Sequence, residues 1–198
     1  MKEFKGVHSI LLVGVGGQGT ILISKILSAG FMQRGYDVKM SEIHGMSQRG
    51  GSVTTQIRYG DKVYSPTIGL GEANVIIAFE KAEALRALPY LKRGGILITD
   101  DHEIYPMPVL TGDAVYPYDA LEKIEASGTK PIVVKAAGTA EALGNARAQN
   151  IVLLGALVTA WNLDDIDWEP LIRQYVPAKA VGINLEAFAV GKGMRSMV

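Results

Sequence analysis

Ile10-Leu11-Leu12-Val13-Gly14-Val15-Gly16-Gly17-Gln18-Gly19-Thr20 is a continuous apolar run that leads into a loop of closely spaced glycines. After the loop, apolar residues recur at helical spacing on two adjacent lines, which are Leu22, Ile26 and Ala29 and, beside them, Ile23, Leu27 and Phe31. This order predicts a strand, a glycine turn and a helix. Arg34-Gly35 ends the helix and residues 36–40 return as a second strand, so we expect a βαβ unit in a parallel sheet.

The segment that follows departs from this parallel pattern. Val53–Tyr59 alternates and is rich in β-branched residues, and Gly60-Asp61 separates it from Lys62–Ser65, which predicts a β-hairpin. Further elements are expected as strands at 75–79, 96–99 and 132–135 and as helices at 81–91 and 118–126. From about Thr139 the chain is helical, and Gly155 in an apolar stripe indicates close helix packing. We expect an α/β, Rossmann-like, mostly parallel sheet with helices on both faces, an inserted β-hairpin and a helical C-terminal part.

Composition narrows the classes of function. The 198 residues, 48% of them hydrophobic, suit a single domain over 1–198. Twenty basic and twenty acidic residues give no charge pattern for nucleic acid or a membrane surface. The absence of cysteine excludes disulfides, a thiolate nucleophile and an iron–sulfur cluster held by this chain's own thiolates. With no signal-peptide pattern and no apolar run of bilayer length, we expect a cytoplasmic protein.

The glycine loop is the first candidate site. Gly14, Gly16 and Gly19 fit G-x-G-x-x-G, and Glu42 lies a little over about twenty residues further on, where a ribose-binding acid is found in dinucleotide sites. A tight βαβ turn with close packing, or a contact with a partner, needs the same glycines. A P-loop is disfavoured because Thr20 stands where the phosphate-binding lysine belongs. The residues assigned to a possible anion, coenzyme or partner contact are Gly14, Gly16, Gly17, Gln18, Gly19 and Thr20.

A second loop, over residues 41–52, combines polar and charged side chains with three glycines. Strand alternation places Glu42 and His44 on one side, where they are able to pair as an acid/base couple. The alternative is a contact loop at the carboxyl edge of the sheet, where Arg49 offers five donors to a carboxylate, phosphate or carbonyl. No catalytic residue is assigned. The candidate partner or substrate-entrance residues are Glu42, His44, Gly45, Met46, Ser47, Gln48, Arg49, Gly50, Gly51 and Ser52.

An acidic stretch forms the third candidate. Asp100-Asp101-His102-Glu103, with Asp113 and Tyr116, contains ligand types that hold a cation. Such a run is more often a solvated strand end and turn. We therefore assign no metal to this chain.

Three segments together resemble the gamma-type subunit of 2-oxoacid:ferredoxin oxidoreductases. They are Gly14–Thr20, Ser41–Val53 with its His44-Gly45-Met46-Ser47-Gln48-Arg49-Gly50-Gly51 core, and Ala78-Phe79-Glu80-Lys81-Ala82-Glu83-Ala84-Leu85-Arg86. The second segment is most similar to the beta subunit of the indolepyruvate branch. The resemblance continues through Asn150–Ala156 and Asn184–Phe188.

This resemblance implies a subunit of an enzyme that converts an aryl 2-oxoacid to acyl-CoA and CO2 and reduces ferredoxin. It implies that thiamine diphosphate, Mg2+ and the iron–sulfur clusters belong to a larger partner subunit, that coenzyme A is a co-substrate, and that this chain is inactive alone. Two other readings stay open. One is a freestanding NAD- or FAD-binding oxidoreductase that uses the glycine loop and Glu42. The other is an assembly module whose loops only bind a partner.

Overall fold

A computed structural model of the protein describes residues 6–44 and 50–194. Within these residues six strands form one sheet in the order β2-β3-β1-β4-β5-β6. They are β1 (Val7–Val15), β2 (Asp37–His44), β3 (Ser52–Gly60), β4 (Ala73–Ala78), β5 (Leu91–Asp100) and β6 (Ile132–Val134). β1, β4, β5 and β6 are parallel, and β1 and β2 both pair antiparallel with β3. Five of these strands therefore run one way, which confirms the mostly parallel α/β sheet.

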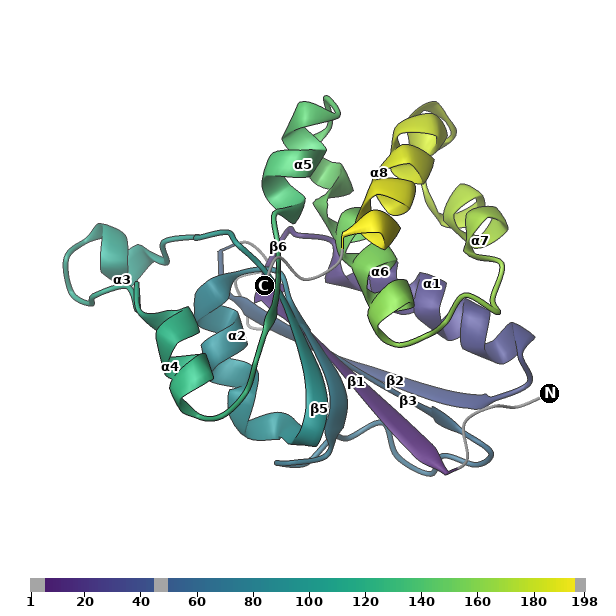
Figure 1. Ribbon diagram of the computed structural model, residues 1–198, viewed down its shortest axis with the longest axis horizontal. Coiled ribbons are helices and arrows are strands. Elements are labelled where there is room, and N and C mark those ends of the chain that lie inside the picture. The colour runs from purple at the N-terminus through teal and green to yellow at the C-terminus, as the bar shows by residue number, and fades with distance from the viewer. Residues whose placement is uncertain (1–5, 45–49, 195–198) are drawn as a thin grey trace.

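Helices cover both faces of the sheet (Figure 1). They are α1 (Thr20–Gln33), α2 (Lys81–Ala87), α3 (Met107–Leu110), α4 (Ala120–Ala126), α5 (Ala136–Ala142), α6 (Gln149–Ala160), α7 (Trp168–Tyr175) and α8 (Val181–Gly193). Ile10 and Leu12 of β1 pack in the core that α1 and α6 help to form, while Leu11 and Val13 pack on the other face with α2 and α4. Because the middle of β1 is buried on both faces, its residues 10–13 form a continuous apolar run.

The predicted hairpin is wrong in its pairing, although the antiparallel departure at residues 53–59 is confirmed. β3 lies between β1 and β2, so the two parallel strands of the expected βαβ unit are not neighbours. Lys62–Ser65 is not a strand. The reason is that β1 and β2 occupy both hydrogen-bonding edges of β3 and leave none for the following residues.

The close helix packing predicted at Gly155 is confirmed. A Cβ atom added to Gly155 would lie 2.7 Å from the backbone nitrogen of Lys192 in α8. One added to Gly191 would overlap the carbonyl group of Val152 in α6. The two helices therefore touch backbone to backbone, which positions α6 between α8 and the sheet.

Candidate functional site

The glycine loop connects β1 to α1, and its glycines meet different demands. Gly17 has φ +107° and Gly19 has φ +84°, both in the left-handed region that favours glycine. A Cβ on Gly14 would lie 3.0 Å from the Cβ of Phe79, and one on Gly19 would overlap the side-chain amide of Asn150. Turn geometry and close packing thus account for glycine at positions 14, 17 and 19. A ligand contact at this loop stays a prediction.

The Gln18 side chain turns back into the protein. Its Oε1 accepts a hydrogen bond from the backbone N–H of Val15 at 2.7 Å, and its Nε2 donates to the carbonyl oxygen of Phe79 at 2.8 Å. Gln149 donates to the same carbonyl at 3.1 Å and to the Asp100 carboxylate at 2.6 Å. The two amides join the ends of β1, β4 and β5. These hydrogen bonds lie beside the crevice between α1 and α2, which follow β1 and β4 and cover opposite faces of the sheet. In open α/β sheets, ligands bind in such a crevice.

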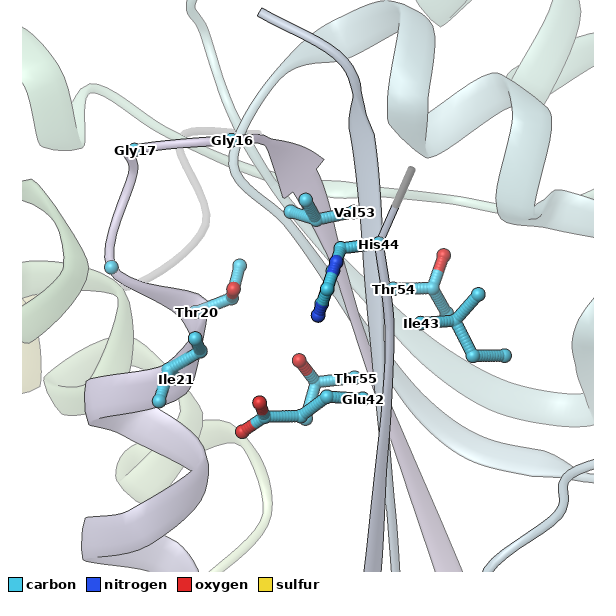
Figure 2. Close-up of a pocket in the computed structure, with 11 residues that line it drawn as sticks. Gly16, Gly17, Thr20, Ile21, Glu42, Ile43, His44, Val53, Thr54 and Thr55 are labelled. Carbon is cyan, nitrogen blue, oxygen red and sulfur yellow. The ribbon is translucent and has the colours of Figure 1, made fainter. Parts of the chain in front are cut away.

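A pocket of about 310 Å³ lies between the glycine loop and the ends of β2 and β3. Figure 2 shows that Glu42, His44, Thr20 and Thr55 point into it, while Ile43 points away. The alternation predicted for Glu42 and His44 is therefore confirmed. The pocket combines a carboxylate, an imidazole and two hydroxyls with the first turn of α1, where helical N–H groups lack intrahelical acceptors. These groups suit hydrogen bonding to a polar ligand.

The second loop meets the glycine loop at its C-terminal end. Gly50 has φ +78°, and the carbonyl oxygen of Gly51 accepts a hydrogen bond from the N–H of Gly16 at 2.8 Å. The glycine loop and the C-terminal end of the second loop therefore lie together at one edge of the sheet. Five of the predicted contact residues lie outside the described residues, namely Gly45, Met46, Ser47, Gln48 and Arg49.

Two buried carboxylates, which the sequence analysis named only within a segment of the family resemblance and assigned no role, lie beside this edge. Ser52 donates to Glu83 at 2.6 Å, and Arg86 pairs with the same carboxylate at 2.8 Å. Burial raises the pKa of the Glu83 carboxyl. Glu80 caps α2 by accepting the N–H of Glu83 at 2.9 Å, and it also accepts the Tyr116 hydroxyl. The sequence does contain a signal for this cap. Glu80 directly follows an apolar strand and precedes a second acid, Glu83, by three residues, a spacing typical of helix N-termini.

The acidic stretch after β5 does not converge on one point. Asp100 is fully buried and accepts the N–H groups of Ala136 and Ala137 at 2.8 and 2.9 Å. Burial raises the pKa of its carboxyl. Asp101 and Glu103 instead pair with Lys81 at 3.2 and 2.7 Å. Within residues 6–44 and 50–194, no three His, Asp or Glu side chains are grouped as a metal would require.

Comparison with known proteins identifies relatives along nearly the whole chain. The family model described as pyruvate ferredoxin/flavodoxin oxidoreductase matches residues 9–193. The chain is 39% identical over 196 residues to the indolepyruvate oxidoreductase subunit IorB of Thermococcus kodakarensis, covering 96% of this chain and 95% of the relative.

Solved structures share the fold at lower identity. The gamma subunit of a keto/oxoacid ferredoxin oxidoreductase from Geobacter sulfurreducens superposes with TM-score 0.71 at 22% identity, over 94% of both chains. A 2-oxoglutarate:ferredoxin oxidoreductase from Magnetococcus marinus, solved with 2-oxoglutarate, coenzyme A and succinyl-CoA, gives TM-score 0.74 at 21% identity. That match covers 98% of this chain and 32% of the other. In the described part of the present structure, no helix is long and apolar enough to cross a bilayer.

Proposed function

This chain belongs to the pyruvate ferredoxin/flavodoxin oxidoreductase family, and from that premise we propose that it is the non-redox subunit of an aryl 2-oxoacid:ferredoxin oxidoreductase. The enzyme decarboxylates a substrate such as indolepyruvate, transfers the acyl group to coenzyme A and passes two electrons to ferredoxin. The name of the Thermococcus relative, 39% identical over nearly its full length, supports indolepyruvate.

The division of labour follows from the residue types present. Iron–sulfur clusters are held by cysteine thiolates, and the chain contains no cysteine. We therefore propose that the clusters lie on a larger partner subunit, and the family resemblance implies the same for thiamine diphosphate and Mg2+. In this proposal the present chain supplies a surface near the reaction centre and is inactive alone.

The observation that carries the proposal is the hydrogen bond between the two candidate loops. Because Gly16 donates to Gly51, the glycine loop lies against the C-terminal end of the second loop at the carboxyl edge of the sheet. We propose that this edge meets the larger subunit beside the path of coenzyme A or substrate. Arg49, Gln48 and Ser47 are proposed contacts on that path.

Reconstitution with the larger subunit tests the proposal. The wild-type complex should reduce a dye with indolepyruvate and coenzyme A, and the separate chain should not. Arg49→Ala should raise the KM for coenzyme A or impair assembly. Arg93→Ala is the matched control, because Arg93 is exposed near the start of β5, at the opposite edge of the sheet. Unchanged assembly and KM in Arg49→Ala would refute the role of Arg49.

Calorimetric titration of the isolated chain with NAD and FAD tests the freestanding dinucleotide-binding alternative. We expect no dinucleotide binding, since the Gln18 amide bridges the ends of β1 and β4 at the crevice where such a ligand would cross. Tight binding of either dinucleotide would overturn the proposed function.

A further inference from the structure

The connection between β5 and α4 exposes an unusual number of apolar side chains. We name residues 104–118 the α3 lobe; Figure 1 shows α3 projecting from the side of the molecule that carries α2 and α4. Its exposed large side chains are Tyr105 (40% exposed), Met107 (68%), Leu110 (65%), Val115 (87%) and Tyr118 (62%). Apolar surface gathered in this way marks an interaction site, whereas single exposed apolar residues are ordinary.

The α3 lobe is held firmly at its base. The hydroxyl of Tyr116 donates to the Glu80 carboxylate, which is 1% exposed, and the N–H of Ile104 donates to the same group at 3.4 Å. The Tyr116 ring makes edge contacts with Tyr105 and Tyr118, each at 5.2 Å between ring centroids. A segment fixed to the body in this way loses little conformational entropy on binding, so its apolar surface is suited to docking.

Charge on the α3 lobe is nearly absent. Asp113 is its one charged residue, and the Asp113 carboxylate accepts the Thr111 hydroxyl at 2.6 Å. Just before the lobe, Asp101 and Glu103 are paired with Lys81. The surface has no cations for nucleic acid or acidic lipid, so its complement is an uncharged, apolar one.

A groove of about 470 Å³ runs between the α3 lobe and α2. Pro106, Pro108 and Val109 line one side. Leu85 lines the other together with the ion-paired Glu83 and Arg86, so the charges of the groove lie on α2 and the lobe side is apolar. Ser52, at the end of the second loop, reaches the same groove. The α3 lobe and the C-terminal end of that loop therefore border the same groove.

We propose that the α3 lobe is the element through which this chain docks onto the larger subunit of its enzyme, which offers an apolar socket for Leu110 and Val115. This inference rests on the proposed function. The larger subunit suits this lobe because the lobe carries a single charged residue and borders the same groove as the end of the second loop, which the proposed function places against that subunit.

Affinity measurements with the purified larger subunit test this proposal. The double variant Leu110→Ser/Val115→Ser should fold normally, because both side chains are exposed, and should bind the larger subunit at least about tenfold more weakly. The matched control is Tyr64→Ser/Leu70→Ser, which removes two side chains of similar exposure (89% and 71%) from the connection between β3 and β4. Circular dichroism and thermal melts confirm that both variants remain folded.

The outcomes separate this proposal from the proposed function. If wild-type protein binds the larger subunit and the lobe variant binds equally well, or if the control weakens binding as much, the docking role is refuted and the proposed function stands. If the wild-type chain does not bind the larger subunit, both are overturned. Sedimentation showing that the α3 lobe mediates only self-association, or flotation showing that it binds neutral lipid vesicles instead, would also refute the docking role.

Discussion

At the residue scale, glycine sets how closely α6 and α8 approach. Gly191→Ala would place a methyl group against the carbonyl of Val152, and backbone atoms cannot move aside as a flexible side chain would. We expect the free energy of unfolding to fall by about 1–3 kcal/mol, the usual cost of overpacking. Urea unfolding of the isolated chain measures it.

Gly182→Ala is the control for that variant. Gly182 lies in the same helix, and a Cβ there would meet nothing within 4 Å. Replacing an unconstrained helical glycine by alanine should stabilise the protein by about 0.5–1 kcal/mol. If both substitutions destabilised the protein equally, helix contact would not be the cause.

Glu83 leads to a prediction about pH. Burial raises the pKa of its carboxyl above the ordinary value of 4.5, so the folded state binds the proton more tightly than the unfolded chain does. The stability this contributes is complete below pH 4.5 and is lost as the pH rises through the folded pKa. Relative to Glu83→Gln, which does not titrate, the wild type should lose stability as the pH rises from 4.5 toward neutrality. Urea unfolding across that range checks the sign, and a constant or opposite difference would contradict it.

At the scale of elements, Gln18 ties the β1–α1 loop to the sheet. Gln18→Ala removes the acceptor of the Val15 N–H, whereas the Phe79 carbonyl keeps its bond from Gln149. The largely buried N–H of Val15 is then left without an acceptor, which should lower the free energy of unfolding by about 1–3 kcal/mol. Gln149→Ala should lower the free energy of unfolding less. The Phe79 carbonyl keeps its hydrogen bond from Gln18, and the Asp100 carboxylate keeps its bonds from two backbone N–H groups. Denaturant unfolding of both variants measures the order, and the reverse order would refute this account of the loop.

The elements with local signals were predicted well. β1 and α1 follow from an apolar run, a glycine turn and helical spacing, which depend on neighbouring residues. β3 was identified as a strand, but its partners were not, because pairing is decided by residues far away in the sequence. The Gly60-Asp61 turn signal pointed to residues 62–65, yet the N–H of Val63 donates to Asp37 at 2.9 Å.

The candidate site also contains features that the local sequence predicts and features that depend on distant residues. Glu42 and His44 share a face because of alternation, which sequence alone predicts. The bond from Ser52 to Glu83 joins residues 31 positions apart and has no local pattern. Gln18 was assigned to a possible ligand contact from its place in a glycine motif, and only the folded chain shows its hydrogen bonds to Val15 and Phe79.

At the scale of the whole molecule, the distinctive features gather at one edge of the sheet. The glycine loop, the second loop and α2 meet there because the carboxyl ends of β1, β2 and β4 coincide, and the α3 lobe extends from the neighbouring end of β5. The partly buried side chain of Gln18 and the buried side chains of Glu80 and Glu83 connect these parts. The arrangement resembles a prepared contact surface more than an enclosed reaction chamber, as expected if the proposed function is correct and the chemistry takes place on a partner.

Assembly should therefore depend little on salt. The chain carries twenty basic and twenty acidic residues, and the α3 lobe has one charge, so apolar burial dominates the proposed docking. Raising NaCl from about 0.05 M to about 0.5 M should change the dissociation constant of the complex by less than about threefold, because screening weakens only charge–charge attraction. Isothermal titration with the larger subunit at several salt concentrations measures it. A tenfold or greater weakening would indicate docking through charged side chains, such as those of the second loop, and would place the binding energy away from the α3 lobe.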